Sequence, residues 1–181
     1  GLDQDGYALR LLADQCPELV LAASCSKNFG LYRERVGLAA ILAKTPQAAQ
    51  LCTGQLSLTM RKMISMPPDH GAALVAKILS DETLKSNWMD ELETMRVRMV
   101  GLRNGLADAL REQGSANSNG QMANALAGQK GMFSLLPLTP EQAQKIRSDH
   151  AVYLLNSGRI NIAGARTETL ERLASCILDV L

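Results

Sequence analysis

The sequence has few aromatic residues and no excess of charge, and both absences limit its partners. Phe, Trp and Tyr together make up 3% of the 181 residues, and the formal net charge is +1. The basic residues are dispersed, without the interleaved aromatic side chains that a base-stacking surface needs. A near-neutral chain has no electrostatic attraction to nucleic acid or to an anionic membrane. We therefore expect neither as a partner.

Other features are also missing. No apolar run approaches the roughly 20 residues that span a bilayer, and the first residues lack the regions of a signal peptide. The 4 cysteines have neither C-x-x-C nor zinc-site spacing, and the chain has only 2 histidines. We expect no metal site, and we expect a reducing cytoplasm as the setting because no disulfide framework is indicated.

What the chain does contain is typical of a globular protein with a core, since 46% of its residues are hydrophobic and 20% are charged. Two short apolar runs, residues 19–23 and 36–43, have the pattern of strands buried on both faces. About a dozen polar residues separate them. A connection of that length in a compact domain is often functional.

That connection contains Lys27, near the end of the first predicted strand and close to the two serine hydroxyls of Ser24 and Ser26. A lysine that reacts with an aldehyde must be held rigidly and be partly desolvated, so that its amine becomes neutral below its usual pKa. Arg35 and the serines have the donors that bind a phosphate. The alternative at this stage is an ordinary solvated lysine.

The first half of the chain otherwise predicts helices. One ends at Cys16-Pro17, and a second begins with Thr45 as N-cap and Pro46 in its first turn. A third, shorter helix opens at Asp69, with Ala72, Ala76 and Leu79 expected to face inward. No helix separates the two predicted strands, so a parallel crossover is excluded and we expect a mixed sheet.

The longest helix is predicted at about residues 81–112, where apolar residues recur at spacings of three and four. Its length of roughly 45 Å exceeds what a small compact domain needs. We therefore expect it to bridge two domains. A coiled-coil strand is the alternative, but the flanking heptad positions lack complementary charges.

The last third of the chain alternates short elements. The sequence predicts a short helical turn at 122–127, a strand at 131–136, a helix opened by a capping box at 139–142, two strands at 152–155 and 159–163, and a closing helix capped by Thr167. Within the last strand, alternation places Ile160 and Ile162 on one face and Arg159 with Asn161 on the other.

Three segments, in order along the chain, carry a resemblance to a known family. Residues 26–37, SKNFGLYRERVG, resemble the lysine segment of the aspartate and aromatic amino-acid aminotransferases, fold-type I enzymes that use pyridoxal 5′-phosphate. Residues 156–164, NSGRINIAG, resemble the carboxylate-binding motif of that family. Met60-Arg61 and residues 65–71, SMPPDHG, lie between them in the expected order.

The resemblance implies an α/β fold in three parts. Residues 1–90 would be the end of a large, mixed-sheet, cofactor-binding domain, and residues 91–181 a small α/β domain, with the long helix bridging both. The resemblance covers only the C-terminal portion of the family, less than half of its usual chain. Because the acidic residue that pairs with the pyridine nitrogen is absent, we expect this chain alone to be catalytically silent.

The resemblance also implies roles for six residues. Lys27 would bind the cofactor covalently and move the substrate proton, while Ser24 and Arg35 would bind the cofactor phosphate. Arg159 would pair with the substrate α-carboxylate, and Phe133 would line the substrate side of the pocket. Arg61 would cross the interface of a homodimer with shared sites to bind a distal carboxylate.

The resemblance implies an amino acid and a 2-oxo acid as substrates, but it does not identify the amino donor. Met63, Ile64 and Met66 stand where the family commonly has polar or aromatic residues, and Cys25 stands where many members have an aromatic residue. These apolar substitutions make a strict aspartate preference doubtful and leave room for aromatic substrates. Two alternatives remain open: a non-catalytic ligand-binding or dimerisation module, and another fold-type I enzyme such as a decarboxylase or lyase.

Overall fold

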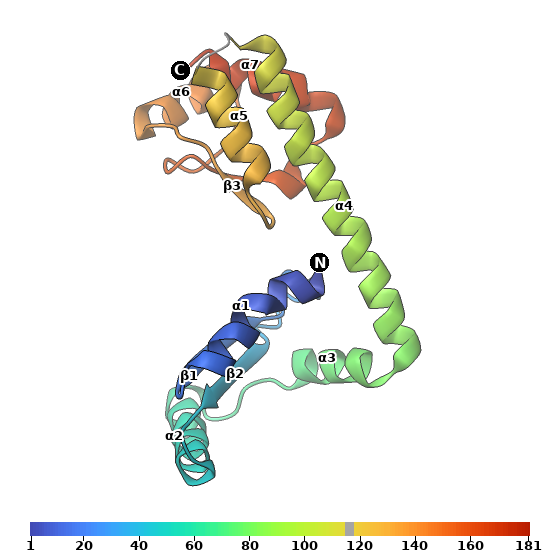
Figure 1. The fold of residues 1–181 in the computed structure, drawn as a ribbon, viewed down its shortest axis with the longest axis vertical. Helices are drawn as coiled ribbons and strands as arrows, with labels where there is room; N and C mark the ends of the chain where they lie inside the picture. The colour runs from blue at the N-terminus through green and yellow to red at the C-terminus, as the bar shows by residue number, and fades with distance from the viewer. Residues whose placement is uncertain (115–117) are drawn as a thin grey trace. The chain divides into compact units, whose positions relative to one another are not determined.

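A computed structural model describes residues 1–114 and 118–181 (Figure 1). The chain forms two compact units, Gly1–Glu93 and Thr94–Leu181, and the division falls within α4 (Glu82–Gln113). The long helix predicted at about 81–112 is therefore confirmed. Each unit is described below by itself.

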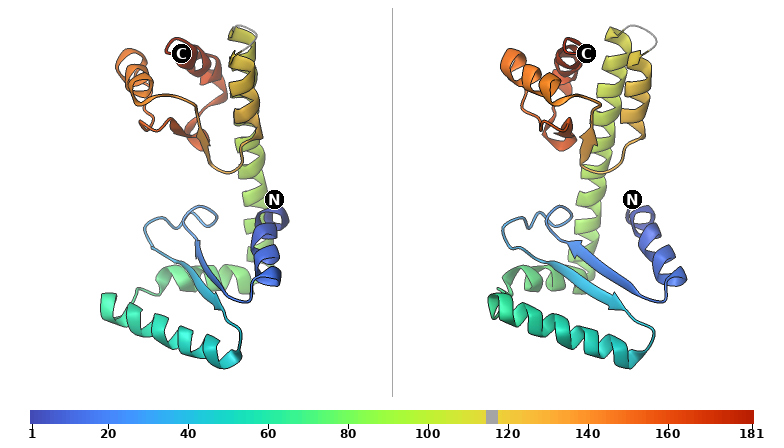
Figure 2. Two further views of the ribbon diagram at one scale, coloured as in Figure 1. Left: turned by 60° about the vertical axis from the view of Figure 1, so that its left-hand side comes forward. Right: turned by 90° about the vertical axis from the view of Figure 1, so that its left-hand side faces the viewer.

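The first unit consists of three helices, one two-stranded sheet and the beginning of α4. Its elements are α1 (Leu2–Gln15), β1 (Leu19–Ser24), β2 (Gly37–Leu42), α2 (Pro46–Ile64) and α3 (His70–Ser80). The two strands are antiparallel, in a register that runs from Leu19 opposite Leu42 to Ser24 opposite Gly37 (Figure 2). As predicted, the Thr45 hydroxyl caps α2 by accepting from the Ala48 amide at 3.1 Å.

The two strands are not buried on both faces, so that prediction is wrong for this chain. Val20 is 76% exposed and Leu38 is 59% exposed. Burial on both faces requires a layer of structure on each side of a sheet, and among the described residues α2 is the helix that packs on β2. The expected mixed sheet is also absent from the described residues, since both of their sheets are antiparallel pairs.

The inward face of α3 differs from the prediction. Ala72, Ala76 and Leu79 are exposed, whereas Gly71 is buried and Val75 is half-buried. The cause is a close approach at the start of the helix, where a Cβ on Gly71 would lie 2.7 Å from the Glu34 Cβ. This contact with the loop between β1 and β2 sets the rotation of α3.

The second unit packs helices around a short sheet. It contains the rest of α4, then α5 (Ser118–Gly128), β3 (Phe133–Leu135), α6 (Pro140–His150), β4 (Arg159–Asn161), 3₁₀ turns at Ile162–Gly164 and Thr167–Thr169, and α7 (Leu170–Leu178). Its core includes seven fully buried large side chains: Leu106, Leu110, Leu126, Leu136, Ile146, Ile162 and Ile177.

The capping box of α6 forms as predicted. The Thr139 hydroxyl accepts from the Gln142 amide at 3.2 Å, and the Gln142 side chain accepts from the Thr139 amide at 2.8 Å. Thr167, by contrast, does not cap the closing helix, because a 3₁₀ turn occupies 167–169 and α7 begins at Leu170. The predicted turn at 122–127 lies within α5.

The partner of β4 also differs from the prediction. Residues 152–155 are not a strand, and β4 instead pairs antiparallel with β3, with Leu135 opposite Arg159. Gly158 has φ +77° and its amide donates to the Leu155 carbonyl at 2.9 Å, which closes a tight turn. The Gly158 carbonyl then accepts from the Leu136 amide at 3.0 Å. This bond continues the β3–β4 ladder.

A buried arginine, not noticed in the sequence, supports β3 from the core side. Arg103 on α4 is 3% exposed. Its Nε donates to the Ser134 hydroxyl at 3.1 Å, and its guanidinium also donates to the Gly131 carbonyl. Burial lowers the pKa of Arg103, but an arginine starts so high that it remains a cation at neutral pH.

No helix in the described part of the chain is both long and apolar enough to cross a membrane.

The buried face of α4 gives a prediction on stability. Replacing Leu106, which is 0% exposed, with Ala removes core contacts and leaves a cavity. We expect the free energy of unfolding to fall by about 2–5 kcal/mol, measured by urea denaturation. Leu84→Ala on the same helix is the matched control, because Leu84 is 38% exposed, and we expect a change within about 0.5 kcal/mol. Equal losses in both variants would contradict the assigned core.

Candidate functional site

The loop that carries Lys27 is closed at its base by an extension of the β1–β2 ladder. Beyond the last strand pair, the Cys25 amide donates to the Val36 carbonyl at 3.0 Å. The next residues beyond the two strands are Ser26 and Arg35, which the same register places opposite each other. Antiparallel pairing thus brings the start and the end of the loop together.

Two serines at this base form a hydrogen-bonded pair. The Ser24 hydroxyl donates to the Ser26 hydroxyl at 2.8 Å and accepts from the Ser26 amide at 3.1 Å. Ser26 is 4% exposed. Ser24 was a predicted phosphate ligand, but the pairing of its hydroxyl with a buried one was missed. The two serines on either side of Cys25 were the signal for it.

Arg35 has a backbone conformation unusual for a residue with a side chain. Its φ is +51°, in the left-handed region, which costs of order 1–3 kcal/mol outside glycine. Its Nη1 donates to the Tyr32 carbonyl at 3.1 Å, and the side chain is otherwise exposed. One N–H of the guanidinium edge is therefore tied to the loop, while its remaining donors are accessible to an anion.

Lys27 itself is exposed, so the partial desolvation expected from the sequence is not seen in this chain. Its Nζ lies 5.4 Å from the centroid of the Tyr32 ring. Gly30 closes a turn over it by donating to the Lys27 carbonyl at 3.3 Å. No hydrogen bond or ion pair joins its amine to another described residue.

An aromatic anchor holds the two residues that follow Lys27. The Trp88 indole N–H, from α4, donates to the Asn28 carbonyl at 2.7 Å. The Phe29 ring stacks on Trp88, with ring centroids 4.6 Å apart and planes 8° from parallel. The Asn28 Oδ1 is buried and has no partner among the described residues. The sequence placed Trp88 only on the apolar face of a helix, so this anchor was missed.

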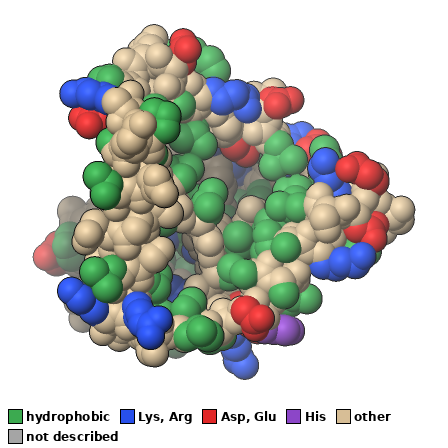
Figure 3. All heavy atoms as spheres, turned by 90° about the horizontal axis from the view of Figure 1, so that it is seen from below, with side chains coloured by type: hydrophobic (Ala, Val, Ile, Leu, Met, Phe, Trp, Pro, Cys, Tyr) green, Lys and Arg blue, Asp and Glu red, His purple; other side chains and the backbone are tan. Residues whose placement is uncertain are grey.

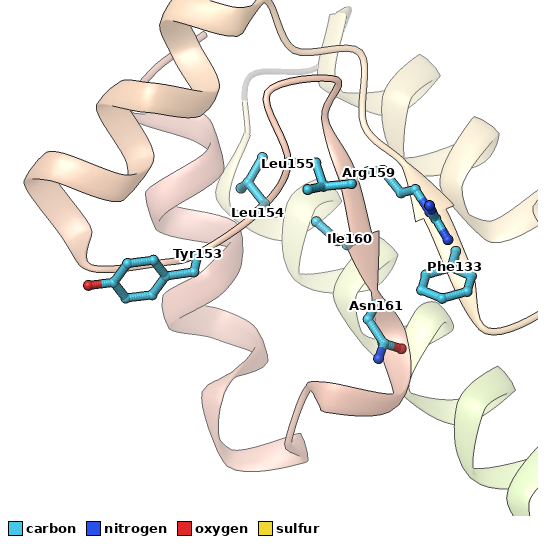
Figure 4. Close-up of a pocket in the computed structure, with 7 residues that line it drawn as sticks. All are labelled: Phe133, Tyr153, Leu154, Leu155, Arg159, Ile160 and Asn161. Atoms are coloured by element: carbon cyan, nitrogen blue, oxygen red, sulfur yellow. The ribbon is translucent and has the colours of Figure 1, made fainter. Parts of the chain in front are cut away.

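The second group of predicted residues lies in the second unit, on the sheet of β3 and β4. A pocket there is lined by Phe133, Tyr153, Leu154, Leu155, Arg159, Ile160 and Asn161 (Figure 4). The Arg159 guanidinium lies over the Phe133 ring, with Cζ 3.8 Å from the ring centroid. Arg159 and Asn161 are exposed and Ile162 is buried, as the predicted alternation requires.

Arg61 lies apart from both groups, in the last turn of α2. Its side chain is exposed, as are those of Met63 at 74% and Met66 at 83%. Figure 3 shows hydrophobic side chains spread over the face of the molecule on which α2 lies. An exposed arginine among exposed apolar residues has the composition of a contact surface.

The structure therefore places Lys27 and Arg35 in one loop, with Ser24 at the end of β1 where that loop begins, and Phe133 with Arg159 in one sheet. Lys27 and Arg159 belong to different units, and their convergence on one substrate stays a prediction. Within the described ranges, no group of three His, Cys, Asp or Glu residues is arranged to hold a metal ion.

Comparison with known proteins gives consistent results. A profile described as aminotransferase class I and II matches residues 2–177. The chain is 44% identical to an aromatic-amino-acid aminotransferase of Pseudomonas aeruginosa, over 99% of this chain and 44% of the relative. It is 39% identical to an aspartate aminotransferase of Escherichia coli, over 100% of this chain and 45% of the relative.

Solved structures agree with these relatives. An aromatic amino acid aminotransferase with 3-indolebutyric acid has a TM-score of 0.91 at 40% identity, covering 99% of this chain and 45% of that one. An aromatic-amino-acid aminotransferase from Burkholderia pseudomallei, covalently bound to pyridoxal phosphate, has a TM-score of 0.90 at 34% identity, covering 100% and 44%. The chain thus spans less than half the length of these proteins.

The Trp88 anchor predicts a measurable change in loop order. Trp88→Phe keeps a ring next to Phe29 but removes the donor to the Asn28 carbonyl. A hydrogen bond contributes about 0.5–1.5 kcal/mol, so we expect amide hydrogen exchange at Phe29 and Leu31 to accelerate by about 2- to 12-fold. Trp88→Leu, which also removes the stacking, should accelerate it further. Exchange in α7 is the internal control, and unchanged exchange at both loop amides would refute the anchor.

Proposed function

This chain belongs to the aminotransferase class I and II family, and on that premise we propose that the whole protein transfers an amino group between an amino acid and a 2-oxo acid, with pyridoxal 5′-phosphate as cofactor. The observation that supports this most directly is the Lys27 loop. It carries an amine without a described hydrogen bond or ion pair, and the paired hydroxyls of Ser24 and Ser26 lie at the start of the loop, with the exposed Arg35 at its end.

The residues of this loop fit a phosphorylated aldehyde. Hydroxyls and a guanidinium are the donors that phosphate oxygens accept from. Arg35 keeps donors free after its bond to the Tyr32 carbonyl, and the buried Ser26 holds the Ser24 hydroxyl in place. When bound, the cofactor supplies the electron-withdrawing system that stabilises negative charge at the substrate Cα.

Lys27 would act in two ways in this proposal. Its amine would bind the cofactor covalently, and after release by the incoming amino acid its Nζ would accept the proton from the substrate Cα. Both roles need a neutral amine, and a neighbouring carboxylate would stabilise the protonated form instead. Among the described residues no carboxylate pairs with Lys27, whose Nζ lies 5.4 Å from the centroid of the Tyr32 ring.

Arg159 would bind the α-carboxylate of the substrate, since a guanidinium matches a carboxylate with two parallel hydrogen bonds. Phe133 would line the same pocket. Exposed Met63 and Met66 near Arg61 support a pocket mouth that tolerates aromatic as well as dicarboxylic substrates. The names of the relatives, aromatic and aspartate aminotransferases, are consistent with either donor.

We further propose a cytoplasmic homodimer in which Arg61 of one protomer reaches the active site of the other. The exposure of Arg61 and of its apolar neighbours on α2 supports this. The 181 residues span less than half of the relatives' length, so the activity belongs to the whole protein. We expect the isolated chain to be catalytically silent.

Reductive trapping tests the proposal. We expect the whole protein, incubated with pyridoxal phosphate and then borohydride, to carry a pyridoxyl group on Lys27, identified by peptide mass spectrometry. Lys27→Arg keeps the charge but removes the reactive amine, and we expect transamination to fall by at least about 10²–10⁴-fold.

Lys44→Arg is the matched control for this test. Lys44 is also exposed, with its Nζ 3.8 Å from a Glu18 carboxylate oxygen, and we expect normal labelling and turnover from that variant. A pyridoxyl group on other lysines alone, or full turnover by Lys27→Arg, would rule out the assigned role. Labelling without turnover by the wild-type protein would favour a non-catalytic binding module.

A further inference from the structure

We propose that Phe133 is a positioning residue for Arg159: the face of its ring fixes the guanidinium plane so that the outer N–H edge is presented to a carboxylate. This inference rests on the proposed function, because it concerns how the same site binds the carboxylate of its substrate. It assigns to Phe133 a role different from contact with the substrate side chain.

The sheet register explains why these two side chains meet. Ser134 pairs with Ile160 and Leu135 with Arg159, so Phe133 and Arg159 are diagonal neighbours on the exposed face. Diagonal pairs on an antiparallel ladder lie within reach of an aromatic and a long side chain. The observed Cζ-to-centroid distance of 3.8 Å is that of a guanidinium stacked on a ring (Figure 4).

Stacking leaves the guanidinium free for a ligand. The guanidinium carbon lies over the ring, and a guanidinium stacked on a ring by its face keeps the N–H donors at its edge, pointing outward in its plane. No salt bridge occupies Arg159 among the described residues. No hydrogen bond joins Arg159 to the nearby Asn161 either, whose Oδ1 accepts from the Ala163 amide at 3.1 Å.

The ring is in turn supported from behind. The adjacent Ser134 is on the buried face of β3 and accepts from Arg103. The same guanidinium donates to the Gly131 carbonyl, just before the strand. Phe133 therefore lies on a backbone that is tied to α4 on both sides, which makes it a rigid support for a flexible arginine side chain.

A contact of this kind has a limited but measurable value. An arginine over an aromatic ring is stabilised by an amount that corresponds to about 2- to 30-fold in an equilibrium constant, depending on its exposure. If the ring acts only through Arg159, its loss weakens every ligand that shares the carboxylate. If the ring instead touches the substrate side chain, its loss affects aromatic and non-aromatic ligands differently.

The experiment uses the whole protein loaded with pyridoxal phosphate and two carboxylate probes, 3-phenylpropionate and succinate. Dissociation constants are measured by calorimetry for the wild type, Phe133→Leu and Phe133→Tyr. We expect Phe133→Leu to weaken both probes by the same factor, between about 2- and 30-fold. Phe133→Tyr keeps the ring face, and we expect it to restore both affinities.

An Arg159→Lys background provides the matched control. An ammonium group is not planar and does not stack in the same way, so we expect Phe133→Leu to cause a smaller loss there than in the wild type. Thermal melting of each variant separates this effect from unfolding. If Phe133→Leu does not fold, Phe133→Met takes its place with the same expectation.

Three results would overturn the inference. The first is a loss for 3-phenylpropionate alone, which identifies the ring as a wall for the side chain. The second is unchanged binding of both probes in Phe133→Leu. The third is no binding of either probe by the wild type, which would refute carboxylate binding by Arg159 as well. Either of the first two results would overturn the role of Phe133 but leave the proposed function standing, whereas the third would also count against the proposed function.

Discussion

Antiparallel backbone pairing between segments that are separated in the sequence is the interaction on which both parts of the candidate site depend. The β1–β2 ladder joins the two ends of the Lys27 loop, with Ser24 opposite Gly37 and Cys25 bonded to Val36. The β3–β4 ladder brings Phe133 to Arg159. A two-stranded ladder is marginal by itself in water, so each needs support from another element.

Helix α4 provides that support within each unit, in each case through the nitrogen donors of one side chain. In the first unit the Trp88 indole donates to the backbone beside Lys27. In the second, Arg103 donates to Ser134 and Gly131 on the buried side of β3. A buried donor without its acceptor costs roughly 1–3 kcal/mol, which makes each of these bonds specific for one loop or strand position. The long helix is thus a scaffold for both groups of residues.

The reactive side chains are exposed, whereas the side chains that hold their loop and strand in place are buried. Lys27, Arg35 and Arg159 are accessible, while Ser26, Arg103 and Ser134 are buried. This division fits a site in which rigid, packed residues orient a few accessible side chains toward a ligand. The relatives of this chain are about twice as long as it is. Exposed reactive groups are consistent with a site that the rest of such a protein would cover.

Local signals in the sequence determined the parts of the structure that depend on neighbouring residues. The caps at Thr45 and Thr139, the long helix and the strand positions of β1 and β2 follow from capping, periodicity and apolar runs, and the lysine segment indicated the family. Tertiary structure alone decided the rest. The rotation of α3, the pairing of β4 with β3, the burial of Arg103 and the stacking of Phe133 on Arg159 all depend on contacts between distant segments. Such contacts form only where the packed chain brings the segments together, and no local pattern of residues predicts which segments will pack against each other.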